Sequence, residues 1–465
     1  MQAITSWLCP LIIRPLVSGS SLFRRLQSDI GLSFLRTFVA RGVAALGAVA
    51  LLLVVGRILG PEGVGAMALA QAVLMGASLM ARGGMDNALM RFVGQDHGSM
   101  HVFLYLRWAM LQGLAIGLVV AALLVGLRGW VEGLFSSAGL ADMLLGFALA
   151  VPASVFAFLL AGFFKGVRMP ATASMMENGS VSLFTAVFLL IWFSLAGELD
   201  YAAIGWAYFV AATLVAGQGA VQLGLWRRPK LVNGVAEGPA VSRGQFHITS
   251  RAFFASTFAN FMQSVLAVMI AGWLLTDAGL GLFKSAQQIG MLIAFVLVVI
   301  NAIFPPRFAA LYHQGKHSEL NRLARQGALL GIIIAMPLLL ICLIFPGWVL
   351  HWFGEDFTQA AALLRVIALA QLVNVASGSV GFLLNMTGHE KLMRNIALIC
   401  NALGLLGFWV LIPPFGPMGA ALALAFVLVC QNLVALVFVW RILGIWTLPC
   451  PNVLAMLGMR TLAKD

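Results

Sequence analysis

Long apolar stretches alternate with short polar segments along almost the whole chain. The segments 43–55, 114–125, 148–163 and 332–345 contain no charged residue. With their apolar flanks, such stretches reach the roughly 20 residues that a helix needs to cross a hydrocarbon core of about 30 Å. They are expected to be helices, because a chain in lipid must satisfy its backbone hydrogen bonds internally. The pattern predicts an all-α polytopic membrane protein with about twelve transmembrane helices, at 37–59, 63–81, 105–127, 140–163, 176–196, 201–225, 252–275, 279–304, 326–348, 359–385, 392–412 and 416–440.

The composition indicates the same class. Of 465 residues, 62% are apolar and only 9% are charged, whereas soluble domains carry about 25% charged residues. The five cysteines are odd in number and lack metal-ligand spacing, so we expect neither a disulfide framework nor a metal site. The net charge of +12 comes from basic residues spread over many short loops. We therefore expect no nucleic-acid partner.

The basic residues fall mostly on one side of the predicted membrane. With the N-terminus inside, the outer loops contain only Arg57 and Arg128 among the basic residues, and Glu62, Glu198 and Glu355 lie on the outer side. An excess of Lys and Arg on the cytoplasmic side sets the orientation of membrane proteins. The sequence thus predicts that both termini are cytoplasmic.

One motif occurs twice, 216 residues apart. Residues 58–71 read ILGPEGVGAMALAQ and residues 274–287 read LLTDAGLGLFKSAQ, with two glycines, an alanine and a glutamine in register. We expect these small residues to let helices 2 and 8 approach helices 1 and 7. Because each half begins inside, the two six-helix pseudo-repeats are parallel and surround a central cavity that holds the site. The predicted parts are an interfacial N-terminal segment (1–36), a first half (37–225), a cytoplasmic linker (226–251), a second half (252–440) and a cytoplasmic tail (441–465).

Several segments resemble a known family in order and spacing. Residues 57–65 (RILGPEGVG) and 84–92 (GMDNALMRF) resemble the amino-terminal signature of the Wzx-type polysaccharide-biosynthesis flippases of the multidrug/oligosaccharidyl-lipid/polysaccharide exporter superfamily. The second half agrees at 279–287 (GLGLFKSAQ) and 304–308 (FPPRF), and the resemblance spans roughly 33–445. Arg82 departs from the family pattern, since many relatives carry an acidic or neutral residue there.

The resemblance implies a flippase that moves an undecaprenyl-diphosphate-linked oligosaccharide across the bacterial inner membrane by alternating access. The product would feed O-antigen, capsule or exopolysaccharide synthesis. The implied partners are the lipid-linked oligosaccharide, membrane lipid, a polysaccharide polymerase and chain-length machinery. No cofactor is expected, and the membrane potential or an ion gradient would drive transport.

Two other functions remain open at this stage. A multidrug or toxin antiporter of the same superfamily would need a lumenal carboxylate, for which Asp142 and Glu177 are the nearest candidates. A polysaccharide polymerase or ligase would need a large catalytic outer loop, and the predicted outer loops are too short. We find no P-loop and no nucleophile with a credible base, so we expect a transporter rather than an enzyme.

Charged residues inside apolar helices are costly and mark candidate substrate contacts. They are Arg41 in helix 1, Lys284 in helix 8 and Arg365 in helix 10. Cations suit a diphosphate because they donate charge-assisted hydrogen bonds to it. In the alternative interpretation, Arg41 snorkels to the inner headgroups, Lys284 snorkels to the outer headgroups and Arg365 pairs with Glu355 or Asp356.

Amides inside the apolar segments are the other candidates for substrate binding. They recognise sugar hydroxyls in one interpretation and bond neighbouring helices in the other. Arg91 and Arg307 occupy equivalent inner helix ends, where they either anchor the helix or form a gate with Asp86 or with phosphate. The amide candidates are Gln71, Gln287, Gln288, Asn260, Gln263 and Asn374.

Overall fold

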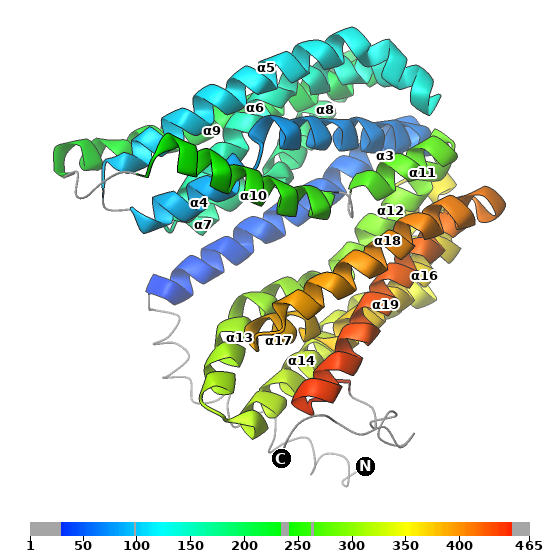
Figure 1. The fold of residues 1–465 in the computed structure, drawn as a ribbon. Helices are drawn as coiled ribbons and strands as arrows, with labels where there is room; N and C mark the ends of the chain where they lie inside the picture. The colour runs from blue at the N-terminus through cyan, green and yellow to red at the C-terminus, as the bar shows by residue number, and fades with distance from the viewer. Residues whose placement is uncertain (1–28, 97–98, 234–240, 262–264, 449–465) are drawn as a thin grey trace.

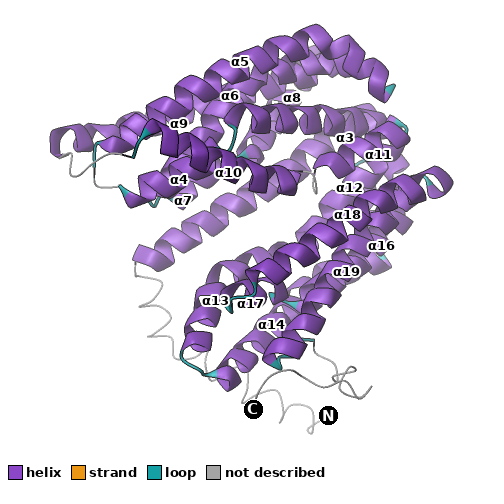
Figure 2. Cartoon of the chain, viewed as in Figure 1, coloured by secondary structure: helices purple, strands orange, loops and turns teal. Residues whose placement is uncertain are grey.

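The computed structural model of the chain describes residues 29–96, 99–233, 241–261 and 265–448. Within these ranges every regular element is helical, as Figure 2 shows. Eight of these helices are long and apolar enough to cross a membrane, and the first of them, Arg36–Arg82, contains the two predicted spans 37–59 and 63–81. The all-α membrane fold predicted from the sequence is therefore confirmed.

Each half of the sequence folds into a series of helices. The first half consists of α3 (Asp29–Arg82), α4 (Met85–Gln95), α5 (His101–Phe135), α6 (Leu140–Gly166), α7 (Pro170–Met175), α8 (Asn178–Ala196) and α9 (Tyr201–Asn233). The second half consists of α10 (Arg243–Phe261), α11 (Ala267–Leu274), α12 (Asp277–Ile293), α13 (Phe295–His313), α14 (His317–Ile344), α15 (Pro346–His351), η2 (Glu355–Ala360), α16 (Ala361–Ser377), α17 (Val380–Met386), α18 (Glu390–Phe415) and α19 (Pro417–Leu443).

The structure separates predicted helices 1 and 2 as expected and divides others. Helices 1 and 2 are the two segments of α3, which meet at a kink at Gly60, whose φ of 67° lies in the left-handed region. The predicted helix 10 is divided at Gly378, which also has a φ of 67°. Polar partners compensate this break, because Thr447 donates to the carbonyl of Ser377 at 2.8 Å and Ser379 donates to Asn301 at 2.6 Å. Irregular backbone at membrane depth is tolerated where protein groups satisfy it in this way.

The two halves form two bundles that approach each other at one end. In Figure 1, α5, α6, α8 and α9 lie in one bundle, and α13, α14, α18 and α19 lie in the other. The bundles are close near α11 and α12 and diverge toward the end where α4 and α13 lie. The first segment of α3, dark blue in Figure 1, runs between them.

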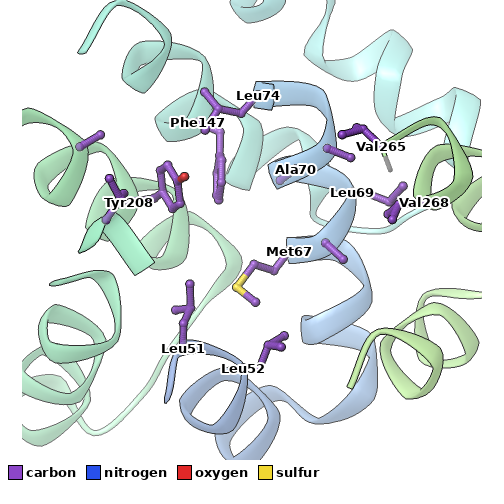
Figure 3. Packing of buried hydrophobic residues seen from close by; sticks show 14 of the residues in the cluster. Leu51, Leu52, Met67, Leu69, Ala70, Leu74, Phe147, Tyr208, Val265 and Val268 are labelled. Carbon is purple, nitrogen blue, oxygen red and sulfur yellow. The ribbon is translucent and has the colours of Figure 1, made fainter. Parts of the chain in front are cut away.

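Apolar side chains from both segments of α3 form the centre of the first bundle. Leu51 and Leu52 of the first segment lie beside Met67 of the second, as Figure 3 shows. Across this cluster, the rings of Phe147 and Tyr208 stack at a centroid distance of 4.3 Å and join α6 to α9. These buried side chains pack the two segments of α3 against each other and against neighbouring helices.

The repeated glycine motif forms a symmetric contact between the halves. A Cβ on Gly65 would lie within 3.0 Å of backbone atoms of Asp277, and a Cβ on Gly281 would do the same at Pro61. Pro61 and Asp277 are equivalent positions of the repeat, as are Gly65 and Gly281. The expected partners, helices 1 and 7, are therefore wrong for these two glycines. Helices 2 and 8 instead pack directly on each other.

The boundary between the halves also differs from the prediction. The predicted linker 226–251 is too long, because α9 continues to Asn233 and α10 begins at Arg243. Helix α10 packs on the first half, where Phe246 is buried with its ring 5.9 Å from that of Phe92. Residues 1–28 and 449–465, which hold most of the predicted terminal segments, lie outside the described residues.

Candidate functional site

A cavity lies between the two halves, close to the contact of α3 with α12. Five helical segments line it: the second segment of α3, α11, α12, α18 and α19. It encloses about 1280 Å³ including its open side. The described lining is mostly apolar, with five polar side chains, Gln71, Lys284, Gln287, Asn401 and Gln431. We call this space the central cavity.

Lys284 is the one charged residue in the described lining of the central cavity. Its Nζ donates to Oε1 of Gln287 at 3.1 Å, one turn further along α12. The alternative interpretation, in which Lys284 snorkels outward, does not fit, because the ammonium group turns toward Gln287 and away from the N-terminal end of α12, which is the predicted outer end. No carboxylate pairs with it, since the ion pairs within the described ranges are Arg82–Asp86, Lys165–Glu177 and Lys316–Glu319.

The repeat explains why two glutamines meet in this cavity. Gln71 and Gln287 are equivalent positions of the motif, and both line the central cavity from opposite halves. Asn401 and Gln431 approach from α18 and α19. The Oδ1 atom of Asn401 is buried without a hydrogen-bond partner among the described residues. Such an atom favours a ligand that donates hydrogen bonds.

A smaller pocket adjoins the central cavity and shares Met75 and Val265 with it. We call it the inner pocket, because it lies toward the C-terminal end of α3, which is predicted to be cytoplasmic. Its lining comes from α3, α6 and α10 and from Val265, and consists of Leu74, Met75, Ser78, Leu79, Arg82, Ser154, Phe158, Thr257, Phe261 and Val265.

One face of α3 connects the two spaces. Gln71, Met75, Ser78 and Arg82 follow one another at steps of three and four residues, which places them on the same side of a helix. At a rise of about 1.5 Å per residue, the stripe extends roughly 16 Å. It begins with an amide in the central cavity and ends with a guanidinium in the inner pocket.

The candidate gate has a different pairing from the one expected. Asp86 binds Nη1 of Arg82 through Oδ2 at 3.0 Å, so it is not the partner of Arg91. Arg91 is exposed and lies over the ring of Phe92 at 5.6 Å. Arg307 is exposed on α13. The expected placement at helix ends is wrong for both arginines, because α4 continues to Gln95 and α13 continues to His313. Neither arginine lines the two spaces described above.

Two of the three predicted intramembrane cations lie away from the cavity. Arg41 is exposed on the first segment of α3 and does not line the central cavity. Arg365 is also exposed, and its Nε donates to the carbonyl of Leu343 at 3.1 Å. This carbonyl takes the place of Glu355 and Asp356 as its partner.

The other four predicted amides lie away from the central cavity or have side chains that are not described. Asn374 donates to Gln371 at 2.8 Å and accepts from Asn432 at 3.2 Å, so it joins α16 to α19. Gln288 is half-buried on α12 and does not line the central cavity. Asn260 belongs to α10, but its side chain is not described, and Gln263 lies outside the described residues.

Sequence reasoning missed Asn401, Gln431 and the role of Arg82 in the lining. The signal for the two amides was present, because each interrupts a long apolar stretch of its helix. Arg82 lies next to the turn at Gly83. The sequence there is as consistent with an exposed position at the inner surface as with a buried one. Its burial, with 9% of its surface exposed, depends on α6 and α10 packing around it.

Comparison with known proteins gives matches over most of the chain. A family model described as "Polysaccharide biosynthesis protein" matches residues 31–312, and a second, described as MatE, matches residues 252–410. The capsular polysaccharide biosynthesis protein CapF of Staphylococcus aureus is 27% identical over 153 residues. That alignment covers 31% of this chain and 37% of the length of CapF.

Solved structures show the same fold. A structure of the lipid II flippase MurJ in an inward closed conformation superposes with a TM-score of 0.67 at 12% identity, covering 88% of this chain and 87% of MurJ. An inward-facing multidrug resistance transporter of the MATE family gives 0.66 at 14% identity, covering 85% and 93%. The first family model spans well over half of this chain. The chain therefore belongs to the polysaccharide biosynthesis protein family.

Proposed function

We propose that this protein is a flippase that moves an undecaprenyl-diphosphate-linked oligosaccharide across the bacterial inner membrane. The family, the likeness to MurJ and the cavity between the two halves support this proposal. The protein acts as a transporter, and its product feeds O-antigen, capsule or exopolysaccharide synthesis. A polysaccharide polymerase and chain-length machinery are its partners on the far side of the membrane.

Lys284 is the observation that carries the proposal. An ammonium group inside a mostly apolar cavity is costly unless an anion compensates it, and no described carboxylate does so. The diphosphate of the substrate supplies that anion through charge-assisted hydrogen bonds. The amides of Gln71, Gln287, Asn401 and Gln431 then meet sugar hydroxyls, which both donate and accept hydrogen bonds.

The arrangement of the halves suits alternating access. With both termini cytoplasmic, the contact between Gly65 and Gly281 lies at the outer end, and the bundles diverge toward the inner end. The described conformation is then inward-facing. Moving the negatively charged headgroup outward is favoured by a membrane potential that is negative inside, by about 2.3 kcal/mol per charge at 100 mV. We infer that the membrane potential contributes to the driving force.

A multidrug antiporter is the second candidate, supported by the likeness to MATE transporters. Export of organic cations needs an acidic group in the lumen. The described lining of the central cavity instead contains a lysine and no Asp or Glu. This charge favours an anionic substrate over a cationic one.

The test uses purified protein in liposomes that contain a fluorescent undecaprenyl-diphosphate-linked sugar in one leaflet. We expect Lys284→Gln to slow flipping by about 10- to 150-fold, since a hydrogen bond to a charged group contributes about 1.5–3 kcal/mol. Lys391→Gln is the matched control, because Lys391 is exposed at the start of α18, and it should flip at the wild-type rate. Transport of cationic dyes without any flipping of the lipid-linked sugar would refute the proposed function.

A further inference from the structure

The inner pocket contains a cation that the proposed function does not require. Arg82 ends α3 immediately before Gly83 and Gly84, which turn the chain into α4. Its guanidinium lies over the ring of Phe158 at 4.0 Å from the centroid, and its Nε donates to the carbonyl of Ser78 at 3.2 Å. These contacts hold the charged group at the pocket wall, away from the predicted inner surface.

One carboxylate forms an ion pair with Arg82. Asp86, in the first turn of α4, accepts a hydrogen bond from Nη1 at 3.0 Å. Asp86 is not among the residues that line the pocket, whereas Arg82 is. A guanidinium carries five N–H donors, more than the bonds to Ser78 and Asp86 use. Asp86 therefore weakens the positive potential in the pocket without blocking access to the arginine.

Hydroxyl groups surround the same pocket. Ser78, Ser154 and Thr257 line it. The Oγ atom of Ser78 is buried and has no hydrogen-bond partner among the described residues. Buried polar atoms normally have hydrogen-bond partners. Oxygen atoms of a ligand in this pocket could accept hydrogen bonds from both the Ser78 hydroxyl and the Arg82 guanidinium.

We propose that Arg82 forms a second anion-binding position, which holds the diphosphate of the lipid-linked substrate before it reaches Lys284. This rests on the proposed function. The polar stripe on α3 joins the two positions, and the two spaces share Met75 and Val265. Asp86 keeps the inner position weaker than the one at Lys284, which has no paired carboxylate. The substrate anion thus moves from Arg82, whose charge Asp86 partly balances, to Lys284, which pairs with no described carboxylate.

The test measures binding of undecaprenyl diphosphate, without sugar, to full-length Lys284→Gln protein in nanodiscs of zwitterionic lipid, so that the stronger position at Lys284 does not mask the inner one. Added to this reference protein, Arg82→Gln should weaken binding by about tenfold, whereas Asp86→Asn should strengthen it severalfold because the competing charge is removed. Arg82→Lys should fall between Arg82→Gln and the reference. Phosphatidylglycerol at the same concentration should not compete, which distinguishes the diphosphate from an ordinary anionic headgroup.

A double variant separates this role from a structural ion pair. In Arg82→Gln/Asp86→Asn, two neutral amides can restore a hydrogen bond between α3 and α4. We expect binding to stay as weak as in Arg82→Gln, whereas a purely structural pair predicts recovery to the affinity of the Lys284→Gln reference. Recovery, equal losses in Arg82→Gln and Asp86→Asn, or equal competition by phosphatidylglycerol would overturn the inference. The thermal midpoint of each variant shows whether it is folded.

The outcomes for the two proposals are distinguishable. If wild-type protein neither binds undecaprenyl diphosphate nor flips the lipid-linked sugar, the proposed function fails. If the wild type binds undecaprenyl diphosphate while the remaining binding of Lys284→Gln is unchanged by Arg82→Gln and Asp86→Asn, only the inference about Arg82 fails.

Discussion

Replacing Gly65 by alanine should open the contact between the two halves. The added Cβ would lie within 3.0 Å of three backbone atoms of Asp277, a separation that real Cβ atoms essentially never show. Because the atoms it meets are backbone, no side chain can rotate away. The second segment of α3 and α12 would have to separate by about 1 Å, and overpacking of this kind costs about 1–3 kcal/mol.

This cost applies to the conformation in which the two halves touch at Gly65 and Gly281, and it is relieved when they separate there. A penalty of 1–3 kcal/mol changes the ratio of the two conformations by about 5- to 150-fold. The population in which this contact is open should rise accordingly. Gly281→Ala should act in the same direction, because its Cβ would meet the backbone of Pro61.

The double variant Gly65→Ala/Gly281→Ala tests whether one movement of the helices relieves both clashes. The two glycines are in contact with equivalent positions of the same helix pair, so one separation relieves both clashes. We expect the combined effect of Gly65→Ala and Gly281→Ala to be smaller than the sum of the single effects.

Spin labels at two exposed outer positions, Ala138 in the first half and Glu355 in the second, report the separation. Double electron–electron resonance should show a longer-distance population that grows in Gly65→Ala. Gly126→Ala is the matched control, because nothing lies within 4 Å of the added Cβ. An unchanged distance distribution in Gly65→Ala, in protein with the thermal midpoint of the control, would refute the reasoning.

Three further predictions concern stability, each measured as the thermal unfolding midpoint in detergent. Gly146→Ala should destabilise by about 1–3 kcal/mol, because its Cβ would lie within 3.0 Å of the backbone of Gly205 and push α6 from α9; an unchanged midpoint would contradict this packing. Tyr105→Phe should cost about 1–3 kcal/mol, since its hydroxyl donates to Asp96 at 2.6 Å and accepts from the N–H of Val241 at 3.0 Å; a midpoint equal to wild type would show that these bonds add nothing. Glu177→Gln should cost no more than about 1 kcal/mol, because its pair with Lys165 is about one-third exposed, and a larger loss would indicate a second role for Glu177.

The intramembrane charges show what sequence could and could not predict about the site. Arg41, Lys284 and Arg365 are all single charges within predicted helices. Only Lys284 reaches the central cavity. The helices that carry Arg41 and Arg365, the first segment of α3 and α16, have apolar residues around their whole circumference. A helix of that kind has no polar stripe to indicate which side faces protein and which faces lipid.

Arg82 illustrates the opposite error. Its position beside a glycine turn at a predicted inner helix end indicates a surface residue. In the structure Ser78, Phe158 and Asp86 surround it and bury it. These contacts come partly from another helix, so no local pattern along the chain could indicate them.

The sequence by itself determined the class of the protein, the positions of many of its helical spans and its repeated motif. Those features follow from local rules, because every apolar stretch in lipid must form a helix and the repeat is visible in register. The tertiary structure alone decided that Gly65 and Gly281 join the two halves, and that Lys284 faces the central cavity while Arg41 and Arg365 do not. These outcomes depend on how each helix is rotated about its axis, and packing between helices sets that rotation.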